Sequence, residues 1–459
     1  MVLLPGKPEV FFREMVRPST PTPDSHRIHR LSFFDQFSPP FYVPLLYFYL
    51  NHHHQPNHED TTLADLIDDR TRALKRSLSE ALSTYYPLAG RMGDDEDGPL
   101  TFHCNDEGVV FLQARMNSKL STVLSHPDGD QRDEALNLLF PDGFSDKFTS
   151  LSSPLLVQVT SFECGGMALS ICASHKVLDM ASFCAFINYW AATAPSTSLP
   201  SSTKNHPDFN LATLFPPVDL PPATTAIIEP PPKVKSICKR FVFGPSDLAK
   251  LKALAEKNNV KNPTRVELVL ALICSCAISA SKACRSGKWT YKLTQAVNLR
   301  TRLSTLPVAG SDLSLGNLSS AFAMKVAGET DETDLAEMIR RVKTEHFSSC
   351  AAETGGGCDQ FRCFIEETRK GLKAEEAEKV YVSSSWCRFQ LYEADFGWGK
   401  PVWVICGIRE PKIVLLDTRE GGGIEALVCL EEGEMAVFQH DQRLLDFARV
   451  NPIVSVETM

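Results

Sequence analysis

Hydrophobic and polar residues alternate along the first half of the chain in patterns that predict both helices and strands. In residues 61–82, leucines and an isoleucine recur at helical spacing, which predicts an amphipathic helix that ends before Pro87. Residues 155–163 and 167–174 are apolar runs rich in β-forming residues, separated by a Cys-Gly-Gly sequence. These two runs predict a β-hairpin.

The second half of the chain shows the same mixture of signals. Thr264 and Glu267 form a T-x-x-E capping-box pattern ahead of the apolar run 266–277, which predicts a buried helix. Strands are predicted at 289–297 and 402–406. Helix and strand signals therefore occur on both sides of the midpoint, and the expected fold is mixed α/β.

A proline-rich stretch separates these two halves. Residues 195–232 hold ten of the 30 prolines and few periodic apolar positions, so they cannot continue a helix or a central strand. A connector of this length is expected between domains rather than within one. The sequence therefore predicts an N-terminal domain of residues 1–194, a crossover loop of residues 195–232 and a C-terminal domain of residues 233–459.

Composition and charge exclude several classes of protein. The 459 residues are 43% hydrophobic and carry a net charge of −9, which argues against nucleic acid or an anionic membrane as a partner. The 14 cysteines are scattered without paired C-x-x-C spacing, which predicts free thiols and no metal site. No secretory signal pattern and no uninterrupted apolar run of about 20 residues is visible. A soluble, cytoplasmic protein is expected.

Two short motifs suggest chemistry. Residues 175–179 read His-Lys-Val-Leu-Asp, and His175 follows a predicted strand and precedes a helical run, a usual position for a catalytic group. Residues 395–399 read Asp-Phe-Gly-Trp-Gly, and the glycines on either side of the tryptophan predict a tight turn. A second H-x-x-x-D match at residues 126–130 lies in a Pro-Asp-Gly sequence and is interpreted as a surface loop. From the residues alone, a hydrogen-bonded core histidine remains an alternative for His175.

The two motifs, in this order, resemble those of the BAHD acyltransferases, plant enzymes that move acyl groups from coenzyme A thioesters to alcohols or amines. Further stretches that match the family are residues 18–23, 31–36, 86–91, 295–300, 315–317 and 384–386. The resemblance covers essentially the whole chain. It implies two chloramphenicol-acetyltransferase-like domains, each a mixed β-sheet with helices, and an active-site tunnel between them. It also implies that a segment after Gly399 packs on the N-terminal domain.

The resemblance assigns roles around the histidine. His175 is expected to be the general base, and Asp179 a structural brace that caps the following helix. Ser384 and Trp386 are expected to supply a hydroxyl and an indole N–H to the oxyanion close to coenzyme A, although a core tryptophan on a strand is an alternative for Trp386. Met180 stands where the family often has glycine, which leaves the choice of acyl donor open.

The resemblance also gives the second motif a supporting role. Asp395 is expected to form a buried ion pair with Arg300. Gly397 and Trp398 are expected to build the same supporting turn, away from the reacting atoms. A loss of activity after substitution here is predicted to be structural in origin.

The match is strongest to the vinorine synthase-like branch, whose members acetylate alkaloids and alcohols. We therefore expect acetyl-CoA as co-substrate, no permanently bound cofactor, and a hydroxylated alkaloid or terpenoid as acceptor. N-acylation, or a malonyl-, benzoyl- or hydroxycinnamoyl-CoA donor, remains an alternative. A non-catalytic acyl-CoA-binding relative and a hydrolase are further alternatives. A monomer is expected because both halves of the site come from one chain.

Overall fold

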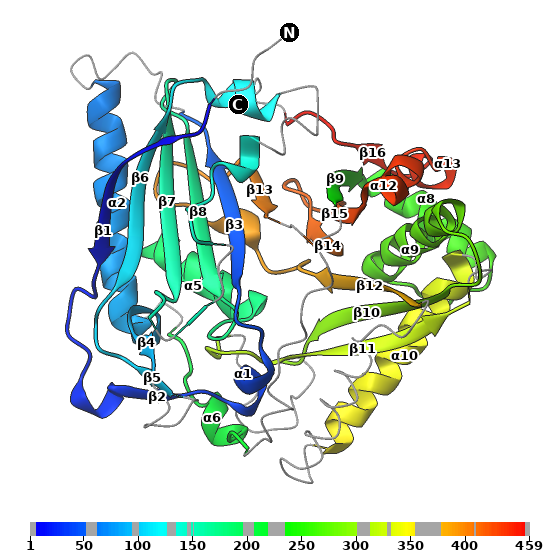
Figure 1. Cartoon of the computed structure of the whole chain (residues 1–459), viewed down its shortest axis with the longest axis horizontal. Coiled ribbons are helices and arrows are strands. Elements are labelled where there is room, and N and C mark those ends of the chain that lie inside the picture. Colours follow the sequence, from blue (N-terminus) through cyan, green and yellow to red (C-terminus); the bar gives the residue numbers. More distant parts are fainter. Residues whose placement is uncertain are drawn as a thin grey trace.

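The computed structural model describes most of the chain, and its strands form two large sheets and one small one (Figure 1). The described residues are 6–51, 62–93, 101–125, 135–144, 148–149, 151–195, 206–218, 235–300, 313–327, 332–353, 378–407 and 410–454.

The first large sheet has six strands and is built almost entirely from the N-terminal half of the chain. Its order is β1-β6-β7-β8-β3-β13, with one parallel pair, β6 and β7, and antiparallel pairs elsewhere. In sheet order, the bounds are β1 (Glu9–Val16), β6 (Val109–Met116), β7 (Leu155–Phe162), β8 (Met167–Ser174), β3 (Tyr42–Tyr49) and β13 (Trp403–Cys406). The hairpin predicted at 155–174 is confirmed as β7 and β8.

Helices and a small sheet accompany this first sheet. The predicted helix at 61–82 is confirmed as α2 (Leu63–Thr84), and it begins at a capping box between Thr62 and Asp65. It packs against α5 (Met180–Thr193), and both contribute to the hydrophobic core of the first sheet. The shorter elements are α1 (Phe33–Phe37), α3 (Leu120–Leu124), α6 (Leu211–Leu214) and the sheet of β2 (Ile28–Arg30), β5 (Thr101–His103) and β4 (Arg91–Met92).

The second large sheet has seven strands, all from the C-terminal half. Its order is β11-β10-β12-β14-β15-β9-β16, with parallel pairing of β10 with β12 and of β12 with β14. In that order the strands are β11 (Ser319–Val326), β10 (Thr290–Asn298), β12 (Glu378–Ser385), β14 (Lys412–Asp417), β15 (Ile424–Glu431), β9 (Ser236–Phe243) and β16 (Arg449–Val450). The strands predicted at 289–297 and 402–406 are confirmed as β10 and β13.

Helices cover the outer face of the second sheet (Figure 1). The predicted buried helix is confirmed as α9 (Arg265–Cys284), which begins at the Thr264–Glu267 capping box. It is long and apolar enough to cross a membrane, but 78% of its apolar window is buried inside the protein, as in the core helix of a soluble domain. The helices packed around it are α8 (Pro245–Lys257), α10 (Glu332–Glu353), α12 (Glu432–Phe438) and α13 (Gln442–Leu445).

One strand crosses from the second half of the chain into the first sheet. β13 pairs antiparallel with β3, so that Trp403 lies opposite Phe48 and Cys406 opposite Leu45. This is the crossing segment that the sequence resemblance implies after Gly399. Two mixed sheets with helices, linked by this strand, confirm the expected fold class. The predicted connector lies largely at residues 196–205 and 219–234, outside the described residues, so its domain boundaries remain a proposal.

Candidate active site

His175 lies directly after β8, in the interface between the two large sheets. Its backbone N–H donates to the carbonyl of Phe41 at 2.8 Å, and the Phe41 ring stands edge-on to the imidazole with centroids 5.6 Å apart. The imidazole is half-buried, whereas Phe41 is 44% exposed. An exposed aromatic ring beside a half-buried imidazole places His175 just beneath the surface.

The imidazole is held from the other half of the chain by Asn317. Its Nδ1 lies 3.0 Å from the Oδ1 of Asn317, and the amide nitrogen of Asn317 donates to the carbonyl of His175 at 2.9 Å. That same nitrogen also donates to a carboxylate oxygen of Asp35 at 2.8 Å. Asp35 is itself buried and accepts from the backbone and hydroxyl of Ser32. The segment after β8, helix α1 and the segment before β11 therefore meet at the histidine.

The pKa of His175 is lowered from its ordinary value. The main cause is burial, which disfavours the charged imidazolium. The positive charge of Lys412 acts in the same direction, whereas a hydrogen bond to its own backbone, the charge of Asp179 and the contact with Asn317 oppose the shift. The balance keeps the imidazole neutral at physiological pH, which is the form that a general base requires.

Asp179 caps the helix after the histidine, as expected, and it forms an ion pair. Its Oδ1 accepts from the backbone N–H of Ser182 at 3.0 Å, and its Oδ2 accepts from Arg300 at 2.6 Å and from the backbone N–H of Leu318 at 2.9 Å. Burial alone would raise the pKa of Asp179, but the charge and hydrogen bond of Arg300 outweigh it and hold that pKa low. Both oxygens are occupied by these donors, and the aspartate braces the loop.

The predicted ion pair between Asp395 and Arg300 is wrong. Arg300 is fully buried. Its guanidinium forms an ion pair with Asp179 and donates hydrogen bonds to the carbonyls of Ser314 and Gly316. Asp395 instead turns onto its own loop and accepts from the backbone N–H groups of Gly397 and Gly399, at 2.8 and 2.9 Å. The physical reason is local, because an aspartate reaches N–H groups two and four residues ahead without any partner from elsewhere.

The turn at residues 395–399 packs on the first sheet and its helices. Gly397 and Gly399 both have φ of +103°, a conformation that favours glycine. Trp398 lies beneath the guanidinium of Arg70 on α2, with 5.6 Å between the guanidinium carbon and the ring centroid. The hydroxyl of Tyr49 donates to the carbonyl of Ala394 at 2.8 Å. Tyr49 ends β3 at the opposite end from His175, so the turn anchors the crossing strand and does not reach the histidine.

Ser384 and Trp386 lie at the end of β12, on the second sheet. Ser384 is in register with Val414 of β14, whose side chain packs into the core of the first sheet, so Ser384 shares the face that meets that sheet. The indole N–H of Trp386 donates to the hydroxyl oxygen of Ser384 at 3.0 Å. The oxyanion role expected of both residues stays a prediction. In this arrangement the indole orients Ser384, and only the serine O–H remains to donate.

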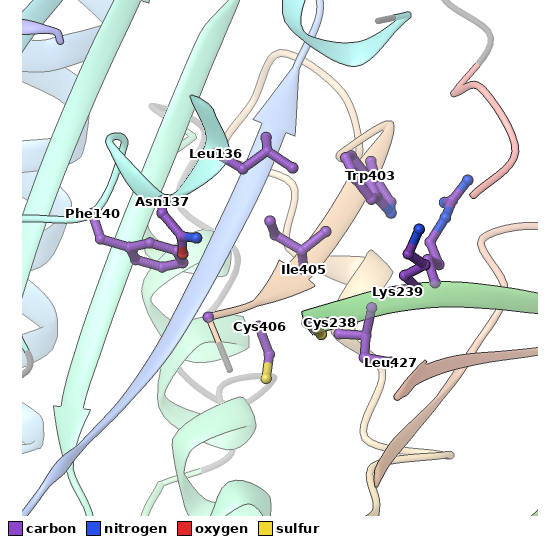
Figure 2. Close-up of a pocket in the computed structure, with 11 residues that line it drawn as sticks. Leu136, Asn137, Phe140, Cys238, Lys239, Trp403, Ile405, Cys406 and Leu427 are labelled. Atoms are coloured by element: carbon purple, nitrogen blue, oxygen red, sulfur yellow. The ribbon is translucent and has the colours of Figure 1, made fainter. Parts of the chain in front are cut away.

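A cavity opens between the two sheets beside the crossing strand (Figure 2). Its lining includes Ile405, Cys406 and Gly407 from β13 and its end, with Leu427 from β15 facing them. The remaining lining residues are Leu136, Asn137, Phe140, Cys238, Lys239, Arg240 and Trp403. Cys406 lies opposite Leu45 on β3. Leu45 is three residues from the end of β3 that lies next to His175, a separation of about 10 Å along the strand. The cavity lining is mainly apolar, and His175 is not part of it.

Lys412, at the start of β14, adds a positive charge that acts on the histidine. It lies two residues before Val414, on the same face of the strand, and its charge acts on both His175 and Cys406. Burial lowers its own pKa. The charges of Cys406 and Glu410 oppose this shift. Sequence reasoning missed this residue because a lysine at the start of a strand usually faces solvent.

Asn317 and Asp35 were also missed as parts of the site. Both lie in stretches that match the family, residues 315–317 and 31–36, but no local pattern links them to a histidine more than 130 residues away. A capping-box pattern, serine followed three residues later by an acid, could have located Asp35 at the start of α1. Within the described residues, no group of three or more His, Cys, Asp or Glu residues could hold a metal ion.

Two mixed sheets that enclose a braced, neutral histidine at their interface define a two-domain acyltransferase. The model of the Transferase family matches residues 7–445, and the chain belongs to this family, the BAHD acyl-CoA-dependent acyltransferases. The protein is therefore an enzyme that transfers acyl groups.

Individual relatives agree with this assignment. The chain is 34% identical over 449 residues to 17,18-epoxy-17-hydroxycur-19-ene N-malonyltransferase of Strychnos nux-vomica, covering 96% of this chain and 90% of that one. It is 33% identical to a limonoid 7-O-acetyltransferase of Citrus sinensis, covering 97% and 99%. Vinorine synthase has a similar structure, with a TM-score of 0.78 and 29% identity over 96% and 98% of the two chains. The fold also matches F. sporotrichioides TRI101 in complex with coenzyme A and T-2, with a TM-score of 0.67 and 16% identity over 93% and 100%.

Proposed function

We propose that this enzyme transfers an acyl group from acyl-CoA to a hydroxyl group of an alkaloid or terpenoid, with His175 as the general base and acetyl-CoA as the donor. The observation that carries the proposal is the imidazole itself, which is half-buried between the sheets, has a lowered pKa and is fixed by Asn317 on one nitrogen. Its other nitrogen is thereby left for a substrate. Alkaloid and terpenoid acceptors are supported by the names of the relatives.

In the proposed reaction, Nε2 of His175 accepts the proton of the acceptor hydroxyl as its oxygen attacks the thioester carbonyl carbon. The hydroxyl of Ser384 donates to the oxyanion of the tetrahedral intermediate. When the intermediate collapses, the C–S bond breaks and the imidazolium returns the proton to the thiolate of coenzyme A. The acceptor leaves as an ester, and the enzyme is regenerated without a covalent acyl-enzyme.

A second donor, malonyl-CoA, is favoured by one specific observation. The charge of Lys412 acts on His175 and on Cys406 of the cavity lining, and a partly buried cation attracts a carboxylate. A malonyl group ends in a carboxylate and an acetyl group does not. The similarity to an N-malonyltransferase agrees with this alternative and with an amine acceptor.

The proposal also includes a cytoplasmic location and a monomeric state.

The test is release of free thiol by the purified protein from acetyl-CoA and, separately, from malonyl-CoA. Each donor is supplied with and without pooled hydroxylated alkaloids and terpenoids, and His175→Ala is measured alongside. The matched control is His440→Ala, which removes an exposed histidine from the C-terminal region. Release that requires an acceptor, disappears in His175→Ala and persists in His440→Ala supports the proposal.

Other outcomes identify the alternatives. Release of thiol without any acceptor would indicate a hydrolase. Binding of acyl-CoA without release from any donor would indicate a non-catalytic relative. Products are then identified by mass spectrometry, which separates an ester from an amide after mild alkaline hydrolysis.

A further inference from the structure

The side-chain amide of Asn317 can adopt only one orientation in its surroundings. Its nitrogen donates to Oδ1 of Asp35 at 2.8 Å and to the backbone carbonyl of His175 at 2.9 Å. Both of these partners are acceptors. Rotating the amide by 180° would place its oxygen against two oxygens, and the buried position offers no water to relieve that contact. The amide oxygen therefore faces the imidazole.

Asp35 is the group that imposes this orientation. Its Oδ1 also accepts from the backbone N–H of Asn317 at 2.7 Å, and its Oδ2 accepts from the backbone N–H and hydroxyl of Ser32 at 2.7 and 2.6 Å. Four donors thus surround a carboxylate that is only 2% exposed. A carboxylate held by four donors is a fixed acceptor, and it selects the nitrogen end of the Asn317 amide.

The amide oxygen in turn selects a form of the imidazole. It lies 3.0 Å from Nδ1 of His175, and an oxygen acceptor at that distance requires a proton on Nδ1. A neutral imidazole with its proton on Nδ1 carries its free lone pair on Nε2. The contacts from Asp35 through Asn317 therefore favour Nε2 as the base, in the same sense as the hydrogen bond of His175 to its own backbone.

We propose that Asp35 and Asn317 are positioning residues that hold neutral His175 in the Nδ1–H form, with Nε2 free to accept the substrate proton. Asp35 and His175 belong to the N-terminal half and Asn317 to the C-terminal half, so the support from Asn317 forms only when the two halves are docked. The consequence for turnover rests on the proposed function, because the tautomer matters only if His175 takes a proton.

The decisive experiment has a spectroscopic arm that needs no activity. The protein is labelled with ¹⁵N-histidine, and the ring nitrogens of His175 are identified by the loss of their signals in His175→Gln. Their long-range couplings to the ring protons report which nitrogen carries the proton. We expect Nδ1–H in the parent protein and a larger share of the Nε2–H form in Asp35→Asn. In that variant the Asn317 amide is free to turn, and the hydrogen bond of His175 to its own backbone still favours Nδ1–H.

The kinetic arm uses three variants. Asn317→Ala and Asp35→Asn are expected to lower kcat by about 10- to 100-fold, the range for loss of the partner that orients a metal-binding histidine, with little change in KM. Asn317→Asp keeps an oxygen beside Nδ1 but adds a negative charge. It is therefore expected to shift the acid limb of the pH profile to higher pH. Asn105→Ala, an exposed asparagine outside the interface, is the matched control.

The outcomes separate this proposal from the proposed function. An Nε2–H form in the full-length protein overturns the proposal, whatever the activity. So does a kcat within twofold of the parent in both Asn317→Ala and Asp35→Asn. A correct Nδ1–H form in a protein that transfers no acyl group would leave the tautomer assignment standing and would reject the proposed function alone. If Asn317→Ala does not fold, the spectra of the parent protein and of Asp35→Asn still show which ring nitrogen of His175 carries the proton.

Discussion

Arg300 and Asp179 form an ion pair across the interface, with Nη1 of the arginine 2.6 Å from Oδ2 of the aspartate and the arginine side chain fully buried. The guanidinium also donates to the carbonyls of Ser314 and Gly316, so it ties the segment before β11 to the loop that carries His175. The pair fixes the position of this loop without touching the imidazole.

Arg300→Met leaves the carboxylate of Asp179 buried without its cation. We expect a loss of about 3–5 kcal/mol in the free energy of unfolding. Urea denaturation measures this loss. The control is Lys250→Met, which breaks an exposed pair with Asp247 and is expected to change stability little. Equal effects of the two substitutions would contradict the structural role assigned to Arg300.

The pH profile of kcat/KM tests the electrostatics around His175. Because the pKa of His175 is lowered, the imidazole stays neutral below its ordinary pKa of about 6.5, and activity is lost only as the pH falls through the lower value. Lys412→Met removes a charge that contributes to this lowering, so the acid limb is expected to move to higher pH. Lys252→Met, at an exposed site on α8, should leave the limb in place. An unchanged limb in Lys412→Met would rule out the charge effect.

Ser384 and Trp386 are expected to differ in importance. Ser384→Ala removes the hydroxyl proposed to donate to the oxyanion and is expected to lower kcat by about 10²–10³-fold. Trp386→Phe removes an N–H that only orients this hydroxyl, so its effect is expected to be smaller. Ser385→Ala, on the opposite face of the same strand, serves as the control. A larger loss in Trp386→Phe would identify the indole as the direct donor.

Asp395 is expected to stabilise its own turn and not to pair with Arg300. Asp395→Ala removes the acceptor for two backbone N–H groups and is expected to lower the free energy of unfolding by about 1–3 kcal/mol. The acid limb of the pH profile should remain where it is in the parent protein. In a double-mutant cycle with Arg300→Met, the two losses should add within about 0.5 kcal/mol, because the residues are not partners. A coupling well above that value would restore the ion pair expected from sequence.

The elements that the sequence predicted correctly are those defined by nearby residues. The capping box of Thr264 and Glu267 and the hairpin at residues 155–174 depend on spacings of only a few positions. The helix cap formed by Asp179 was predictable for the same reason. Short-range patterns therefore gave the fold class and the position of the histidine after its strand.

The parts that were not predicted depend on which distant segments meet. Arg300 is 121 residues from Asp179 in sequence, and no local pattern distinguishes that partner from Asp395. The contact between His175 and Asn317 spans 142 residues and depends on how the sheets dock. Asp395 could have been interpreted correctly from its own sequence, because a short acidic side chain followed by two glycines satisfies its hydrogen bonds locally.

The crossing of β13 into the first sheet also determines the order in which the protein can be assembled during synthesis. β3 has β8 on one side and β13 on the other, and residues 45–48, which face β13, are almost completely buried. Until more than 400 residues have left the ribosome, that side of β3 is an unpaired apolar edge, the kind of surface that invites aggregation. The N-terminal half therefore lacks one strand of its own sheet. Its sheet becomes complete only when nearly the whole chain has been made.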